Sequence, residues 1–222
     1  MEGGKMRLIE KLKPVISPVS GKRILKDVET GRNYRRVSGG VAWPYDIKPG
    51  AVAVLAEDIK PVRGTDHHRV EVVAEFLHED HETLCREMAN LQDMLQVEVW
   101  RTPLNHAGTR LVQMFNERRQ RLRLPCLDLV SPPAMNGSRT FRDYDRLVDR
   151  RTRNIKTLHF GQSQAVLEYN ILGRDDLGHK LEEFPPVAAV LYALAGLDLE
   201  NAAAGFVQDN YFSGMTHSTG GY

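Results

Sequence analysis

The sequence has two cysteines, Cys85 and Cys126, and no apolar run near the ~18 residues that a membrane-spanning helix needs. So few cysteines among 222 residues favour buried free thiols in a reducing compartment over a disulfide framework. The charged N-terminus contains no signal-peptide apolar region, so we expect no export. These absences together predict a cytoplasmic protein without membrane contact.

Several motifs of catalysis and nucleotide binding are also missing. No G-x-x-x-x-G-K-[ST] motif occurs, because Ser20-Gly21-Lys22 lacks the preceding glycine and strand. We therefore expect no ATP-driven motor in this chain. No Cys-His or Ser-His-Asp arrangement has recognisable spacing. His78 and His81 have the separation of a ligand pair, but no third ligand follows, so we predict no zinc site.

The net charge of +1 conceals a strong asymmetry. Residues 71–100 contain eight acids and one arginine, whereas residues 101–156 contain thirteen lysines or arginines and five acids. The first forty residues add ten basic and four acidic groups. Clustered cations suit a polyanion, because they release counterions from phosphates. Solvated helix surface explains such charge runs equally well.

Hydrophobic periodicity predicts a strand-rich first half followed by alternating helices and strands. Residues 1–20 are predicted to be an arm with a short helical turn, which Pro14 and Pro18 interrupt. A hairpin turning at Thr30-Gly31 is expected over residues 23–37. Further strands are predicted at 51–57, 69–77, 96–101 and 124–130, and helices after Asp80 and at 109–121, 142–156 and 185–197.

This order predicts an α/β fold with a mixed sheet of about five strands and helices on both faces. We expect an N-terminal arm and hairpin at 1–37, the main domain at 38–200 and a loose C-terminal tail at 201–222.

Residues 40–51 read Gly-Val-Ala-Trp-Pro-Tyr-Asp-Ile-Lys-Pro-Gly-Ala, a strand and a turn leading into a second strand. This segment resembles the first motif of phage terminase large-subunit nuclease domains, roughly G-[LV]-D-W-G-Y-x-x-D-P-x-A. The matching positions are Gly40, Val41, Trp43, Tyr45, Pro49 and Ala51. The resemblance implies a ribonuclease H-like fold over about residues 40–197. In this family, carboxylates hold two Mg²⁺ or Mn²⁺ ions ~3.5–4 Å apart that cleave DNA.

The resemblance also identifies three positions where this chain lacks the expected acid. Ala42 stands at the aspartate of the first strand. Trp100 and Arg101 occupy the end of the later strand, where a carboxylate is expected. Tyr192-Ala193 matches the family's late helix and puts Ala188 at its aspartate. We therefore predict a degenerate metal site that binds no metal.

Other acids offer an alternative. Asp46 follows the first strand, and Asp175 and Asp176 precede the late helix, so a relocated Mg²⁺ or Mn²⁺ site could use them. Turn and cap roles are the competing interpretation of these acids.

Three functions remain open from the sequence. The first is a catalytically degenerate terminase nuclease-like domain of a phage or prophage, which acts in the cytoplasm of the host cell. It would bind double-stranded DNA or dock on the packaging ATPase or portal proteins. The second is an active DNA endonuclease with relocated carboxylates. The third is a virion assembly protein without nucleic-acid contact.

Arginines supply the predicted DNA contacts. Helical spacing places four of them on one stripe of the charged helix, and others gather near the end of the preceding helix. The predicted contact residues are Arg118, Arg119, Arg121, Arg142, Arg146, Arg150 and Arg153.

Overall fold

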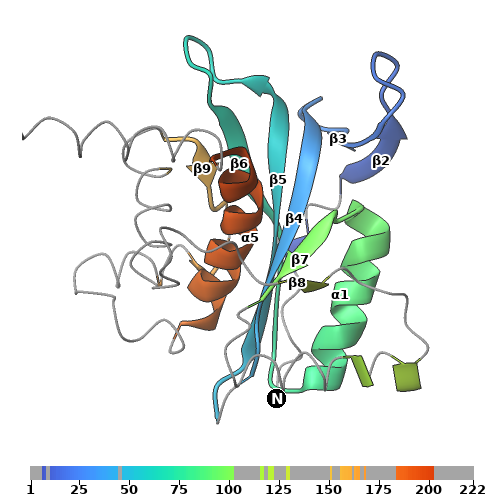
Figure 1. Ribbon diagram of the computed structural model, residues 1–222, viewed down its shortest axis with the longest axis vertical. Helices are drawn as coiled ribbons and strands as arrows, with labels where there is room; N and C mark the ends of the chain where they lie inside the picture. The colour runs from blue at the N-terminus through green and yellow to red at the C-terminus, as the bar shows by residue number, and fades with distance from the viewer. Residues whose placement is uncertain are drawn as a thin grey trace, which may run out of the picture.

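The computed structural model describes residues 7–8, 11–44, 47–102, 116–117, 120–122, 129–130, 151, 156–161, 163–165, 168 and 184–202. These residues form one mixed sheet with a helix packed on each face. Figure 1 shows the sheet nearly edge-on, with α5 on its left and α1 on its right. The predicted mixed α/β class is confirmed at this level.

The sheet contains nine strands among the described residues, where the sequence indicated about five. Six antiparallel strands follow the order β1-β6-β5-β4-β3-β2. Their bounds are Arg7–Leu8 (β1), Leu12–Ile16 (β2), Arg23–Asp27 (β3), Asn33–Ala42 (β4), Gly50–Pro61 (β5) and His68–His78 (β6). Three short strands pair in parallel: β7 (Val99–Arg101) with β4, β8 (Leu129–Val130) with β7, and β9 (Leu158–His159) with β6.

Two strands lie in the segment predicted to be an arm. β1 pairs with β6, and β2 pairs with β3 over its whole length. The sequence indicated a break at Pro14, but β2 ends the sheet order, and an edge strand tolerates a proline because one side donates no ladder hydrogen bond. The hairpin turn at Thr30-Gly31 is confirmed, with Gly31 in the left-handed region at φ 71°.

The middle of the sheet is buried on both faces. Residues 51–56 of β5 are fully buried and all apolar. A strand covered on both faces loses the polar alternation of a half-exposed strand. β4 is continuous through residues 37 and 38, where the sequence predicts the boundary between the N-terminal hairpin and the main domain. Its C-terminal half is buried like β5 and lies at the centre of the molecule.

Helix α1 (His81–Leu95) covers one face of the sheet. Asp80 caps its N-terminus by accepting a hydrogen bond from the Thr83 N–H at 2.7 Å. Its apolar side packs with Trp43 and Trp100 in one buried cluster. The helix ends at Leu95, its C-cap Gln96 has a left-handed backbone, and the chain then enters β7.

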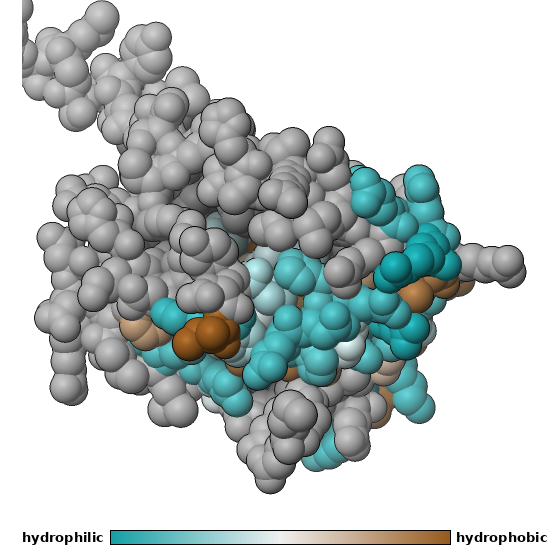
Figure 2. Space-filling view, turned by 90° about the horizontal axis from the view of Figure 1, so that it is seen from below, coloured by the Kyte–Doolittle hydropathy of each residue, from teal (hydrophilic) through white to brown (hydrophobic). Residues whose placement is uncertain are grey.

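Helix α5 (Pro185–Ala202) covers the opposite face. It begins at a Pro-Pro pair, as the sequence predicts, because proline fits the first turn of a helix. From 185 to 197 the helix carries no charged residue, and every residue in that stretch is buried. Among the described residues, no helix is long and apolar enough to cross a membrane. Figure 2 shows the molecule from below, where the coloured surface is mostly hydrophilic with separate hydrophobic patches.

Candidate functional site

Two of the three positions where the terminase pattern places acids lie in one buried cluster. Ala42 ends β4 and is 9% exposed, and Ala188 in the first turns of α5 is 2% exposed. Both belong to the apolar cluster that β4, β5 and α5 form together. A methyl group stands at each position, so neither offers an oxygen ligand to a hard cation.

The backbone of β4 touches the backbone of α5 next to these alanines. A Cβ atom added to Gly40 would lie 1.9 Å from the carbonyl oxygen of Ala189 and 2.6 Å from the nitrogen of Ala193. Only a glycine permits such an approach. The helix therefore rests directly on the strand, without intervening side chains.

Arg101 occupies the third position, at the end of β7. In the parallel pairing of β7 with β4 it lies opposite Gly40, and it is 8% exposed. Its side chain runs along α5 near Gly196, where an added Cβ would lie 3.3 Å from Cγ and 3.4 Å from Nε of Arg101. Ser38 Oγ is the nearest atom to the same position, at 2.3 Å. A buried cation thus lies where the terminase pattern expects a metal-binding anion.

The local electrostatics disfavour divalent ions here. Two Mg²⁺ or Mn²⁺ ions need several oxygen ligands, and a neighbouring guanidinium repels them. Among the residues that the structure describes, no group of three or more His, Cys, Asp or Glu side chains could hold a metal ion.

Sequence reasoning missed a pair of glutamates on the α5 side of the sheet. Glu75 of β6 is 2% exposed and accepts hydrogen bonds from Ser163 Oγ at 2.7 Å and the Gln164 N–H at 2.8 Å. Glu168 Oε2 accepts the Val187 N–H at 3.3 Å. The sequence does show an acid, Glu75, inside the apolar run 72–77, which indicates a buried carboxylate in need of partners. Those partners lie about ninety residues further along the chain, so the sequence does not identify them.

Burial raises the pKa of Glu168 to about 7. The hydrogen bond from Val187 opposes this increase in pKa, and the negative charge of Glu75 adds to it. Each carboxylate of the pair has a protein donor, so the geometry indicates that Glu75 connects β6 to residues 163–165 and that Glu168 connects to the start of α5.

The remaining candidate acids lie outside the described residues, and the His78–His81 pair, for which no zinc site is predicted, makes local contacts. These acids are Asp46, Asp175 and Asp176. His78 Nδ1 lies 2.9 Å from the Asp80 nitrogen, and the ring of His81 stacks on Trp43 with centroids 6.0 Å apart.

Of the arginines predicted to contact DNA, the structure describes Arg121 alone. Its guanidinium pairs with Glu82 Oε2 at 2.8 Å, and Arg86 binds the other oxygen of the same carboxylate at 3.0 Å. The other predicted contact residues lie outside the described part of the chain: Arg118, Arg119, Arg142, Arg146, Arg150 and Arg153. Arg151, next to this stripe, is 8% exposed and donates to Thr157 Oγ1 at 2.9 Å.

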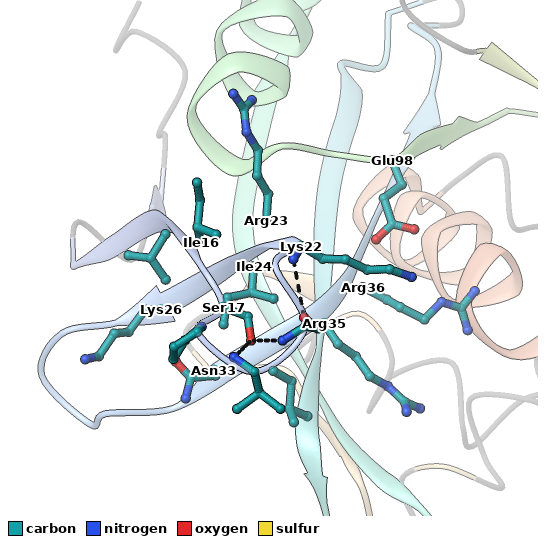
Figure 3. A pocket seen from close by; sticks show the side chains of 15 residues that line it. Ile16, Ser17, Lys22, Arg23, Ile24, Lys26, Asn33, Arg35, Arg36 and Glu98 are labelled. Atoms are coloured by element: carbon teal, nitrogen blue, oxygen red, sulfur yellow. Dashed lines mark hydrogen bonds between the residues drawn. The ribbon is translucent and has the colours of Figure 1, made fainter.

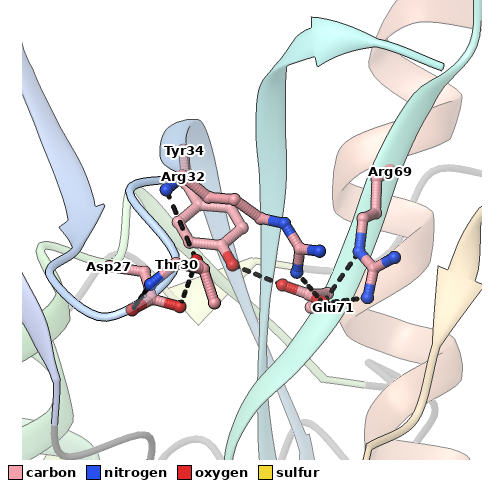
Figure 4. A network of polar contacts seen from close by, with 6 residues as sticks. All are labelled: Asp27, Thr30, Arg32, Tyr34, Arg69 and Glu71. Carbon is pink, nitrogen blue, oxygen red and sulfur yellow. Dashed lines mark hydrogen bonds and ion pairs between the residues drawn. The ribbon is translucent and has the colours of Figure 1, made fainter. Parts of the chain in front are cut away.

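A polar network joins the β3–β4 hairpin to β6 (Figure 4). The carboxylate of Glu71 accepts from the Tyr34 hydroxyl, from Arg32 Nη1 at 2.9 Å and from Arg69 Nε at 2.8 Å. Burial favours the neutral acid, but the bonds from Tyr34 and Arg69 and the nearby arginine charges lower the pKa of Glu71 below its ordinary value. Burial and the Glu71 carboxylate together raise the pKa of Tyr34.

A second polar feature is a groove beside the β2–β3 hairpin, here named the hairpin groove (Figure 3). It encloses about 1050 Å³ between this hairpin, β4 and the start of β7. Five cations and one acid line it: Lys22, Arg23, Lys26, Arg35, Arg36 and Glu98. The sequence showed the positive charge of the first forty residues, but not their gathering around one groove.

Comparison with known proteins yields one structural likeness. No protein-family model matches the sequence, and no curated protein matches it. The structure is similar to the crystal structure of the HK97 bacteriophage large terminase, with a TM-score of 0.48 and 10% sequence identity over 87% of this chain. The chain spans 44% of the length of that protein.

Proposed function

We propose that this chain is a ribonuclease H-like, terminase nuclease-type domain that has lost its metal site and binds DNA without cutting it. It would act with a phage or prophage packaging apparatus, in contact with double-stranded DNA and with packaging ATPase or portal proteins. The motif at residues 40–51 supports the relationship to terminase nucleases. The packing around that motif supports the loss of catalysis.

One observation carries the proposal. The strand that bears the motif lies against the late helix backbone to backbone at Gly40, with alanines at positions 42 and 188 and the buried cation of Arg101 nearby. Restoring one carboxylate would bury an anion in an apolar cluster, which is costly without a partner. The substitutions and the tight packing are therefore mutually consistent features of a closed site.

DNA binding would come from the arginine stripe of the sequence. Phosphate contacts by such a stripe carry no base information, so binding is expected to be non-specific and in the micromolar range or weaker. The DNA affinity should fall as salt rises: the logarithm of the binding constant decreases with the logarithm of the salt concentration, with a slope of roughly 0.9 for each phosphate neutralised.

A gel-shift titration of duplex DNA at low and moderate salt tests this role. The double variant Arg146→Glu/Arg150→Glu should lose the shift at low salt. The variant Lys48→Glu/Arg63→Glu makes the same charge change on loop residues and serves as the matched control, which should retain it. Absence of a shift at low salt, or equal loss in both variants, would contradict DNA binding by the stripe.

The active endonuclease is the competing function. It would need carboxylates from outside the described residues, with Asp46 the leading candidate, and Mg²⁺ or Mn²⁺ as cofactor. The two proposals differ in whether divalent ions support cleavage, and the variant Asp46→Ala separates them.

A further inference from the structure

The hairpin groove exists because β3 leaves β4 early. The two strands pair only at Leu25–Tyr34 and Lys26–Asn33, and β7 takes over the same edge of β4 from Ser38 onward. Between these two pairings, the hairpin diverges from β4 and leaves the groove open (Figure 3).

Two of the groove's cations are available for a partner. Arg23 donates to Gln96 Oε1 at 3.0 Å, Arg35 pairs with Glu57 at 3.0 Å, and Arg36 donates to the Leu197 carbonyl at 2.7 Å. Lys22 and Lys26 form no ion pair with any described residue. The arginines are thereby held in place around the groove, whereas the ammonium groups of the two lysines are not ion-paired within the described part of the chain.

The groove also displays apolar side chains. Val19 is 95% exposed, Ile16 is 68% exposed and Ile59 is 37% exposed, and all three line it. Val19 sits on a turn that hydrogen bonds define: Ser17 Oγ accepts the N–H groups of residues 19 and 20, and the Gly21 N–H donates to the Ser17 carbonyl at 2.9 Å. The turn presents an apolar side chain in the same groove as Lys22 and Lys26.

This combination distinguishes between two kinds of anionic partner. A nucleic-acid backbone offers phosphates and sugars but no aliphatic side chains to cover Val19, Ile16 and Ile59. An acidic peptide with leucine-type side chains supplies both, since aliphatic anchors bury apolar area and carboxylates face the lysines.

We propose that the hairpin groove docks an acidic, amphipathic segment of a partner protein. The carboxylates of the segment contact Lys22 and Lys26, and its aliphatic side chains cover Val19 and Ile16. This docking is independent of the proposed function, because it uses neither the sheet centre nor the arginine stripe.

The test uses the full chain and three labelled probes in fluorescence anisotropy. The first probe is a peptide in which leucines alternate with pairs of Asp and Glu, and the second has serine in place of every leucine. The third is a duplex DNA oligonucleotide. The leucine peptide should bind in the micromolar range, and the serine peptide about tenfold more weakly, because it lacks the apolar contacts.

Variants locate the binding. Lys22→Glu/Lys26→Glu should weaken the leucine peptide about tenfold, since it places like charges opposite its carboxylates. Val19→Ser should weaken the leucine peptide and leave the serine peptide unchanged. The control Lys48→Glu/Arg63→Glu should behave as the wild type. All the substituted side chains are at least partly exposed, and thermal unfolding of each variant checks that the fold persists.

Three results would overturn the proposal. The first is equal affinity for the leucine and serine peptides, and the second is no binding of either. The third is binding of DNA, but not of the leucine peptide, that the Lys22→Glu/Lys26→Glu variant abolishes, which would make the groove a polyanion site. Loss of DNA binding in Arg146→Glu/Arg150→Glu with intact peptide binding would leave the docking proposal standing and test the proposed function separately.

Discussion

Gly40 of β4 and Ala189 of α5 are in backbone contact at the centre of the molecule, so close that a methyl group on Gly40 would lie 1.9 Å from the Ala189 carbonyl oxygen. The contact brings Ala42 and Ala188 into one apolar cluster. At this point helix and strand meet with no room for a side chain between them.

Gly40→Ala should be strongly destabilising, because the obstacle is backbone that cannot rotate away. We expect a loss of about 3 kcal/mol or more in the free energy of unfolding, measured by urea denaturation. Gly31→Ala is the matched control, because nothing lies within 4 Å of its added Cβ. Only the left-handed backbone conformation then destabilises the variant, by about 1 kcal/mol. Equal losses in the two variants would show that α5 does not rest on β4.

Glu71→Gln should destabilise the protein by about 2 kcal/mol, because it leaves the partly exposed Arg32 and Arg69 without their shared carboxylate. Glu82→Gln provides the control, since Glu82 pairs with Arg86 and Arg121 at the surface, where such pairs contribute ~0.5 kcal/mol. Urea denaturation at neutral pH measures both. A loss for Glu71→Gln no larger than for Glu82→Gln would contradict the structural role of the network.

The pKa of Glu71 also sets a direction for acid sensitivity. Its folded-state pKa lies below the ordinary value of 4.5, so its stabilisation is present above pH 4.5 and is lost as the pH falls through the folded-state pKa. The wild type should therefore lose more stability on acidification than Glu71→Gln does.

Glu168 has the opposite pH dependence. Its folded-state pKa of about 7 lies above the ordinary value of 4.5, so the folded protein holds this proton more tightly than the unfolded chain does. The resulting contribution to the free energy of unfolding is fully present below pH 4.5 and is lost as the pH rises to about 7. Glu168→Gln should remove this decline from the wild-type profile of unfolding free energy against pH. Identical slopes in the two proteins across this window would show that Glu168 titrates normally.

The sequence predicted those elements that rest on local chemistry. The turn at Thr30-Gly31 needs a residue that tolerates positive φ, Asp80 caps α1, and the Pro-Pro pair begins α5. The spacing of Leu84, Met88, Leu91, Met94 and Leu95 by three and four predicts one buried side of α1; the structure buries four of them, whereas Met94 is 45% exposed.

Relationships between distant residues could not be predicted. β7 pairs in parallel with β4 some sixty residues earlier, and this pairing buries Arg101 beside α5. Periodicity says which side of an element is buried, but not which element covers it. The proline in β2 indicated a break for the same reason, because edge position is a property of the whole sheet.

The central claim, a terminase nuclease-type domain without a working metal site, is tested most directly by plasmid cleavage in Mg²⁺ and in Mn²⁺. Metal ions supply several kcal/mol of transition-state stabilisation in such enzymes, so their loss should abolish measurable cleavage. We predict that supercoiled plasmid stays intact with either ion, and that Asp46→Ala behaves as the wild type. Robust cleavage by the wild type that disappears in Asp46→Ala would contradict the account and establish an active nuclease with relocated carboxylates.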